Sequence, residues 1–130
     1  MGSTKKAMTL IENILIVIII GIMISFAVPS MFAAKKKAHD KTAISQLALI
    51  LDAEKMVRLE QNEYKDCADT LDCNSVLGLD LSPIGYWNYS IAVDNSVSPA
   101  RLCAQAVSKD GARYWHIQQD SLKATEGACP

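Results

Sequence analysis

The stretch from Met8 to Val28 reads MTLIENILIVIIIGIMISFAV and decides the fold. Its 21 residues contain a single ionisable side chain, that of Glu12. A helix rising ~1.5 Å per residue would make this stretch roughly 30 Å long, which is the thickness of the hydrocarbon core of a bilayer. A core helix of a soluble protein would carry polar residues on one face, whereas Ile14 to Met23 contain none. The stretch therefore predicts a transmembrane helix.

An ordinary secretory signal peptide is an alternative interpretation of the same stretch. Lys5-Lys6 would be its basic start and Ser25-Phe26-Ala27 a weak cleavage site. This alternative leaves unexplained why Glu12 lies within the apolar run and why helix-forming residues continue beyond it.

Composition limits what the rest of the chain can be. The chain has 130 residues, of which 50% are hydrophobic, and a net charge of −1. This length suits one long element plus a small domain, and the balanced charge provides no long-range attraction to nucleic acid. We find no nucleophile elbow, phosphate-binding loop or pair of catalytic carboxylates, so we expect neither an enzyme nor a cofactor.

Two patterns disagree about which side of the membrane holds the C-terminal part. The positive-inside rule weighs Lys5-Lys6 against Lys35-Lys36-Lys37 and Lys41, and this count mildly favours a cytoplasmic C-terminal part. The cysteines favour the opposite, because they are even in number, lack CxxC spacing and have no partnering His cluster for zinc. We therefore expect the C-terminal part outside the cytoplasm, with disulfides among Cys67, Cys73, Cys103 and Cys129.

A second helical segment is expected from about Ser30 to Asn62, after Pro29. Its apolar residues mark two faces, so we expect one face to pack on a sheet and the other on neighbouring subunits. The first face holds Ala43, Leu47, Ile50, Ala53 and Val57, and the broadly opposite one Ile44, Ala48, Leu51 and Leu59. Complete burial of this helix within one chain is the alternative.

The remainder predicts a small head. Tyr64 to Tyr86 reads as a loop with a Ser82-Pro83 turn signal. Three antiparallel strands are expected after it, with Trp115 and Ile117 facing the helix. These strands are Trp87 to Val93, Arg101 to Val107 and Arg113 to Gln119. The fold class is therefore α+β, with a long N-terminal helix, transmembrane in its first half, packed on a three-stranded sheet.

Four cysteines permit three disulfide connectivities. We favour Cys67–Cys73, which closes a small loop, and Cys103–Cys129, which ties the tail to the second strand. The longer closure would stabilise the head by ~2–4 kcal/mol. Crossed pairings stay open.

Several smaller motifs are assigned no function. His39 and His116 are far apart without ligand spacing, so surface or packing roles are expected. Asn88-Tyr89-Ser90 fits the glycosylation pattern but falls in an expected strand. A calcium loop would need more than Asp66, Asp69 and Asp72, because the flanking Gly and Glu are missing. No metal site is expected.

The stretch from Lys5 to Glu12, KKAMTLIE, resembles the processing site of the type IV pilin and pseudopilin family. In that family a short basic leader is followed by a small residue, the cut, and then an apolar residue, Thr, Leu, Ile and Glu. The resemblance extends to Pro29 and covers about the first 30 residues. Ala7 stands where the family usually has Gly, and Met8 where it usually has Phe.

The resemblance implies how the chain would be processed and divided. Prepilin peptidase would cut between Ala7 and Met8, and the new amino group of Met8 would be methylated. Glu12 would pair with the N-terminal ammonium of a neighbouring subunit. The alternative is that Glu12 only sits at the membrane interface, with its carboxylate reaching toward the cytoplasm. Gly21 and Pro29 would bound a segment that either kinks at the proline or melts in the filament. The parts would be a leader (1–7), a transmembrane and polymerisation helix (8–29), the second half of the helix (30–63) and a periplasmic head (64–130).

The function that this implies is a structural subunit of a type IV pilus-like filament. Its partners would be further copies, related minor pilins, prepilin peptidase, the assembly machinery of the inner membrane and, before assembly, the lipid bilayer. A pseudopilin of a type II secretion or DNA-uptake system is the first alternative. A signal-anchored periplasmic binding protein is the second. The expected location is the bacterial inner membrane, followed by a surface pilus or periplasmic pseudopilus.

Overall fold

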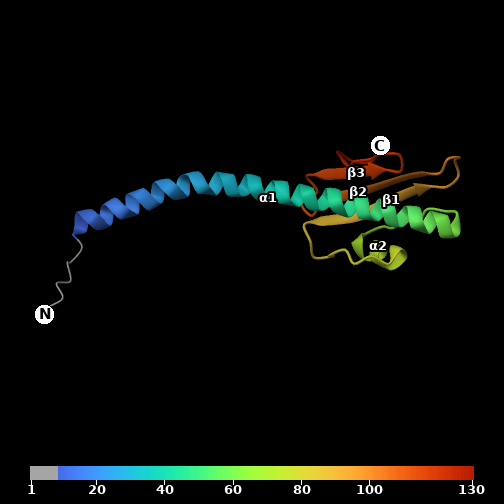
Figure 1. Ribbon diagram of the computed structural model, residues 1–130, viewed down its shortest axis with the longest axis horizontal. Coiled ribbons are helices and arrows are strands. Elements are labelled where there is room, and N and C mark those ends of the chain that lie inside the picture. The colour runs from blue at the N-terminus through green and yellow to red at the C-terminus, as the bar shows by residue number, and fades with distance from the viewer. Residues whose placement is uncertain (1–8) are drawn as a thin grey trace. The chain divides into compact units, whose positions relative to one another are not determined.

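A computed structural model of the chain describes residues 9–130. The expected leader, the cleavage site between Ala7 and Met8, and the methylation site at Met8 lie outside the described residues. The chain forms two compact units, one ending at Ala38 and the other, the head, beginning at His39. Within residues 9–130, two helices and four strands make an α+β fold (Figure 1). They are α1 (Leu10–Gln61), α2 (Thr70–Leu77), β1 (Trp87–Asp94), β2 (Arg101–Ser108), β3 (Tyr114–Gln118) and β4 (Thr125–Glu126).

Helix α1 is one helix of 52 residues, and Pro29 lies inside it. The sequence predicts one long helix whose second half follows Pro29, and this is confirmed, because no interruption separates the two halves. A proline inside a helix leaves the carbonyl four residues earlier without its N–H partner, here that of Ser25. Because Ser25 is exposed, that carbonyl is not trapped in a packed core. Whether this segment melts in a filament stays a prediction.

The sheet is an antiparallel meander in the order β1-β2-β3-β4. Strands β1 and β2 pair from Trp87↔Ser108 to Asp94↔Arg101, and β2 pairs with β3 from Val107↔Tyr114 to Cys103↔Gln118. The three expected strands are confirmed to within about a residue at each end. The expected strand count is wrong, because β4 adds Trp115↔Glu126 and His116↔Thr125. A strand of two residues has no hydrophobic alternation, so the sequence gives no signal for it.

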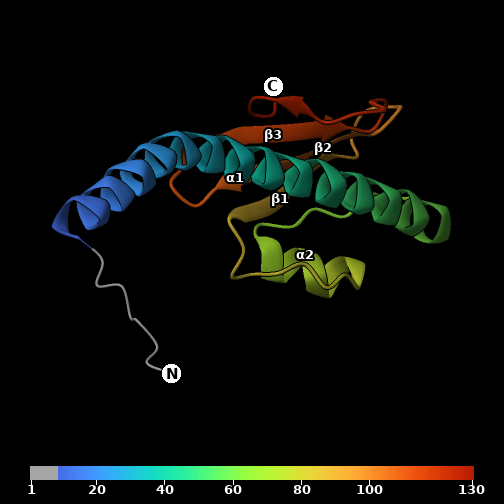
Figure 2. The ribbon, with the colours of Figure 1, turned by 60° about the vertical axis from the view of Figure 1, so that its left-hand side comes forward.

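The core lies between the head part of α1 and one face of the sheet (Figure 2). Alternate residues of the strands point into it, which is the period-two pattern expected for a half-buried sheet. From the strands come Trp87, Tyr89, Ile91, Leu102, Ala104, Ala106 and Ile117, all at most 4% exposed. From α1 come Ala43, Leu47, Ile50 and Leu51. Trp115 is half-buried and packs against this cluster.

One residue of α1 was assigned to the wrong face. Leu51 is 4% exposed, although the sequence pattern placed it with Ala48 on the outer face. On a helix it follows Leu47 by four residues, so the two side chains lie one above the other on the same side. Ala48 and Leu59 are exposed, as expected for the outer face.

The predicted loop before the sheet contains a helix. Helix α2 begins after Asp69, whose side chain accepts the N–H of Asp72, and ends at Gly78, which adopts the left-handed conformation with φ of 64°. Both are standard end signals, an acidic N-cap and a glycine C-cap. The sequence reading missed α2 because eight residues are too short to show a clear apolar stripe.

Helix α2 and the segment before it cover the free edge of β1 (Figures 1 and 2). Cys67 exchanges two backbone hydrogen bonds with Ile91, at 3.3 and 2.9 Å. The Thr70 hydroxyl accepts the N–H of Tyr89 at 3.0 Å and donates to the Asn88 side chain at 2.7 Å. Backbone groups that would otherwise face water as an open sheet edge are therefore paired.

Candidate assembly site

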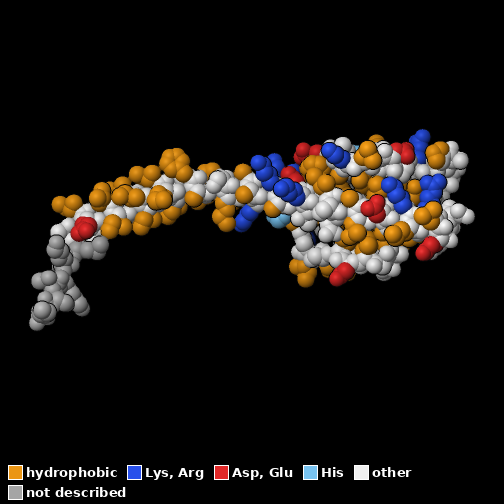
Figure 3. Space-filling model, in the orientation of Figure 1, with side chains coloured by type: hydrophobic (Ala, Val, Ile, Leu, Met, Phe, Trp, Pro, Cys, Tyr) orange, Lys and Arg blue, Asp and Glu red, His pale blue; other side chains and the backbone are white. Residues whose placement is uncertain are grey.

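The first candidate surface is the apolar side chains of α1 from Leu10 to Phe32. Every large hydrophobic side chain in this range is exposed, by 38% to 79%. Figure 3 shows these side chains all along the segment. An 18-residue window of α1 has a mean hydropathy of 2.7 and no buried residue, so α1 is long and apolar enough to cross a membrane.

The free-energy cost of leaving these side chains in water shows that lipid or protein must cover this surface. Burying one large aliphatic or aromatic side chain contributes ~1.5–3 kcal/mol, so leaving this whole set in water would cost roughly tens of kcal/mol. A small domain is stable by only ~5–15 kcal/mol. Lipid or other protein must therefore surround the segment.

Glu12 stands in the first turn of α1, and it is exposed. Its backbone N–H donates to the Thr9 hydroxyl at 3.3 Å, and the Asn13 N–H donates to the Thr9 carbonyl at 3.2 Å. Thr9 thus caps the helix, with Glu12 at the third helical position, the spacing of a capping box. A carboxylate is also favoured there by the unpaired N–H groups of the helix start. Capping is a role of this site that the sequence reading missed.

Gly21 and Pro29 lie within the exposed helical segment. A Cβ added at Gly21 would meet nothing within 4 Å, so no contact within the chain requires a glycine there. The Ser25 hydroxyl donates to the Gly21 carbonyl at 2.9 Å and the Ser30 hydroxyl to the Ala27 carbonyl at 2.8 Å. Such side-chain bonds to helix carbonyls slightly destabilise a helix. The chain thus leaves open space at Gly21 and carries weakening groups beside both residues.

The second candidate surface is the outer face of α1 within the head. Leu49, Met56 and Leu59 are 48%, 68% and 86% exposed there. The opposite face of the same helix is fully buried at Leu47 and Ile50. This helix therefore packs on the sheet with one face, as predicted, and leaves apolar side chains exposed on the other. That neighbouring subunits cover these side chains stays a prediction.

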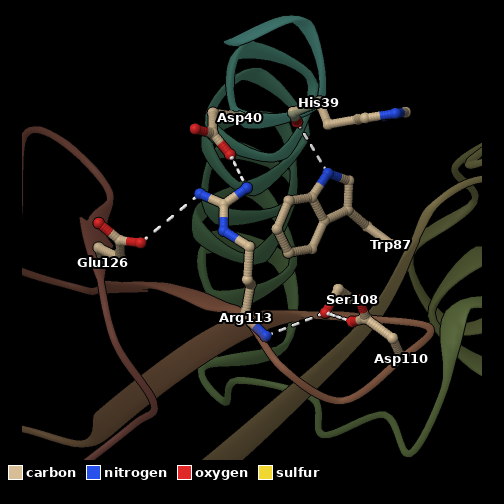
Figure 4. Close-up of polar contacts among 7 residues, drawn as sticks. All are labelled: His39, Asp40, Trp87, Ser108, Asp110, Arg113 and Glu126. Atoms are coloured by element: carbon tan, nitrogen blue, oxygen red, sulfur yellow. Dashed lines mark hydrogen bonds and ion pairs between the residues drawn. The ribbon is translucent and has the colours of Figure 1, made fainter. Parts of the chain in front are cut away.

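A cluster of polar and aromatic contacts fixes the first turn of α1 in the head to the sheet (Figure 4). Arg113 lies 2.6 Å from Asp40 and 3.5 Å from Glu126. Its guanidinium lies 5.8 Å from the centre of the Trp87 ring, and the Trp87 indole N–H donates to the His39 carbonyl at 2.7 Å. The hydrogen bond to Asp40 raises the pKa of Arg113. This clamp ties α1 to both ends of the meander.

The two histidines take packing roles, as expected. The His39 ring stacks on Tyr86 with centroids 4.2 Å apart. The His116 ring lies 2.9 Å from the Gly127 carbonyl oxygen and 3.1 Å from the Thr125 hydroxyl, which holds β4 against β3.

Glu54 is a buried carboxylate that sequence reasoning missed. It is 0% exposed, and one carboxylate oxygen accepts the N–H of Lys65 at 3.0 Å. The other oxygen is buried and has no hydrogen-bond partner among the described residues. Burial, with a smaller contribution from nearby Asp66, raises the pKa of Glu54. In sequence it looks like any helix glutamate, so only its i+3 and i+4 spacing from Leu51 and Ile50 could have signalled burial.

The aspartates considered for calcium binding instead cap the start of α2. Asp69 accepts the Asp72 N–H at 2.9 Å, and Asp72 accepts the Ala68 N–H at 2.9 Å. These carboxylates thus serve the start of α2. Within residues 9–130 no group of three or more His, Cys, Asp or Glu residues is placed to hold a metal ion.

The structure pairs the cysteines as Cys67–Cys73 and Cys103–Cys129. These are the two pairings favoured from the spacing. The first joins the segment beside β1 to α2, across Cα atoms 5.1 Å apart. The second joins β2 to the C-terminal tail, across 6.1 Å.

Comparisons with known proteins give a consistent set of relatives. The chain is 31% identical over 68 residues to type II secretion system core protein G of Aeromonas hydrophila, which covers 52% of this chain and 48% of that protein. It is 34% identical over 60 residues to the protein of the same name from Vibrio cholerae, and 30% identical over 60 residues to that of Escherichia coli. Each of these two matches covers 46% of this chain and 41% of the relative.

The chain thus spans less than half the length of these relatives. No family model matches it, and no solved structure does. The relatives are named as core proteins of type II secretion systems. Over about half of the chain, they support its resemblance to the type IV pilin and pseudopilin family.

Proposed function

We propose that this chain is a structural subunit of a pilin-like filament of the type II secretion kind, a pseudopilin. The observation that carries the proposal is the exposed apolar helix from Leu10 to Phe32, which has one carboxylate near its start. Sequence alone ranks a surface pilus first. The names of the relatives favour the secretion system instead, so the pseudopilus takes first place and the pilus becomes the alternative.

Before assembly, the apolar helix crosses the inner membrane and the head lies in the periplasm. The two disulfides support this orientation, because disulfides persist in oxidising compartments such as the periplasm. The assembly machinery of the inner membrane and related minor subunits are the proposed partners.

Prepilin peptidase removes the leader by cutting between Ala7 and Met8, and the amino group of Met8 is then methylated. The pattern KKAMTLIE supports this step, with a small residue before the bond and a large apolar one after it. Cleavage creates a positive charge one helical turn away from Glu12.

In the filament, Glu12 of one subunit pairs with the amino group of Met8 of the next. Two opposite charges ~4 Å apart attract by about 1 kcal/mol in water and about 4 kcal/mol at the effective dielectric constant of a protein surface. A carboxylate held among apolar side chains is costly without such a partner. The pair therefore sets the axial register, while the apolar side chains of neighbouring helices replace lipid.

The test compares Glu12→Gln with Asp52→Asn, an exposed carboxylate further along the same helix. The full chain is produced together with prepilin peptidase and the secretion assembly machinery. We expect both variants to be cut and methylated at Met8, as seen by intact mass. Filaments recovered after mild shearing should contain the Asp52 variant at wild-type level. They should contain at least about tenfold less of the Glu12 variant, because a tenfold change in the assembly equilibrium corresponds to a loss of only ~1.4 kcal/mol of binding free energy.

Normal filaments from Glu12→Gln would refute the pairing. A chain that retains residues 1–7 in the presence of the peptidase would refute the whole proposal. Long fibres on the cell surface at native expression would favour the pilus over the pseudopilus.

A further inference from the structure

Three consecutive lysines, which we call the lysine collar (Lys35, Lys36 and Lys37), follow the apolar segment of α1. No ionisable residue lies between Glu12 and Lys35. That interval of 23 residues corresponds to ~35 Å of helix. A bilayer has a hydrocarbon core of ~30 Å and a thickness of ~40–45 Å including its headgroups. With Glu12 at one interface, the collar reaches the headgroups of the other.

The three side chains of the lysine collar spread around the axis of α1. Successive residues of a helix are about 100° apart, so three consecutive side chains spread over about 200° of the circumference. A single protein partner would contact one side of the helix, whereas lipid headgroups surround it. The spread therefore fits a lipid surface better than a docked protein.

The three ammonium groups are available for such a contact. All three lysines are exposed. The ion pairs of the described part of the chain are made by Arg113 and do not include the collar. Their hydrocarbon stems can lie along the apolar helix while the charged ends reach outward.

We propose that the lysine collar binds the phosphate groups of anionic phospholipids and thereby fixes the depth of the apolar helix in the bilayer. The proposal rests on the membrane insertion that is part of the proposed function. Extraction of a subunit into the filament would break these contacts, so the collar opposes the release of subunits before assembly.

The test measures the accessibility of individual lysines in the full chain. The protein is placed in nanodiscs, one copy per disc, made either of phosphatidylcholine alone or of phosphatidylcholine with phosphatidylglycerol. Acetylation rates of each lysine are read by mass spectrometry. Lys55, Lys109 and Lys123 serve as internal controls, because they are exposed in the head.

We expect phosphatidylglycerol to slow acetylation of the collar roughly threefold or more, with no change at the controls, and high salt to restore the rate. A matched pair of variants gives a second readout. The triple variant K35Q/K36Q/K37Q should carry fewer phosphatidylglycerol molecules after detergent extraction than K55Q/K109Q/K123Q, as counted by native mass spectrometry.

Other sources of protection are separated in the same experiment. Equal protection by inorganic phosphate in phosphatidylcholine discs would overturn the lipid assignment in favour of a free anion. Protection that depends on two copies per disc, whatever the lipid, would assign the collar to a contact with a second copy and overturn the lipid assignment as well.

Failure of the collar and failure of the proposed function give different results. If the chain is retained in the discs but the collar lysines are acetylated at equal rates in both lipids, only the lipid-binding proposal for the collar is overturned. Chains that are not retained in the discs overturn both.

Discussion

The Asp40 carboxylate of α1 lies 2.6 Å from the Arg113 guanidinium at the start of β3, and both side chains are about four-fifths buried (Figure 4). This contact joins the helix to the sheet near the first residue of the head unit, which begins at His39. Arg113 also contacts Glu126 and lies over Trp87, so a single side chain holds α1, β1 and β4 together.

Replacing Arg113 should therefore loosen the head. We expect Arg113→Met to lower its free energy of unfolding by about 1–2 kcal/mol, because a partly buried charge pair is worth more than a surface pair and the variant removes the ion pair with Asp40. Urea unfolding of the detergent-solubilised chain, followed by near-UV circular dichroism of the tryptophans, measures the change. Arg101→Met, at an exposed position of β2, is the control and should cost less.

Glu54 should make the stability of the head depend on pH. Its pKa is raised in the folded state from 4.5, so the folded chain holds this proton more tightly than the unfolded chain does. The stability that follows is present below pH ~4.5 and is lost as pH rises through the folded pKa. Glu54→Gln keeps an acceptor for the Lys65 N–H and removes the charge. It should therefore gain stability relative to wild type between pH 4 and pH 7, as measured by thermal unfolding at each pH.

The control for this titration is Glu60→Gln, an exposed carboxylate on the same helix. Its stability should follow the wild-type pH profile. Parallel profiles for wild type and Glu54→Gln would contradict the assignment. Glu54→Ala, which leaves the Lys65 N–H unpaired and opens a cavity, should cost roughly 2–4 kcal/mol.

The two disulfides should stabilise different parts of the head. Cys103–Cys129 spans 26 residues and Cys67–Cys73 spans 6, for which loop closure predicts about 3.5 and about 2 kcal/mol. We expect Cys103→Ala/Cys129→Ala to increase amide hydrogen exchange in the C-terminal tail. Cys67→Ala/Cys73→Ala should instead increase exchange at Tyr89 and Ile91, because those residues bond to the segment that this disulfide fixes. The same exchange pattern in both variants would contradict this division.

Gly21→Ala should affect filament assembly, where other helices surround α1, but not the isolated chain. Nothing in the chain contacts a Cβ at this position, and alanine favours a helix over glycine by ~1 kcal/mol. We expect unchanged insertion and head stability but fewer filaments, because a Cβ at this position would crowd a neighbouring helix and a better helix former would oppose melting of the segment. Wild-type filament yield from Gly21→Ala would contradict this role. Filament yield after shearing gives the answer, with Ala34→Gly, at another exposed position of α1, as the control for helix propensity.

The sequence was sufficient to predict the elements with a strong periodic or compositional signal. The apolar run and the three strands each follow from local preferences, and the structure contains all three strands.

The rest depends on contacts between distant residues. The burial of Glu54 and Leu51 follows from where the sheet crosses α1, and their helical spacing from Leu47 and Ile50 alone does not say which residues the sheet covers. The Arg113 clamp joins residues 73 positions apart, so a lone arginine before a strand gave no signal of it. Helix α2 and strand β4 are short elements, stabilised by a disulfide and by side-chain bonds to His116, and periodicity does not report either.

The covered edge of β1 limits how copies of this chain can associate. A neighbour's strand has no free run of backbone groups to join at Cys67 and Thr70, since those residues already satisfy Ile91 and Tyr89. Polymerisation by continuing the sheet from chain to chain, the route of amyloid growth, is blocked along this side. Association along this side must therefore use side chains, such as the exposed apolar ones of α1, rather than a shared ladder of backbone hydrogen bonds.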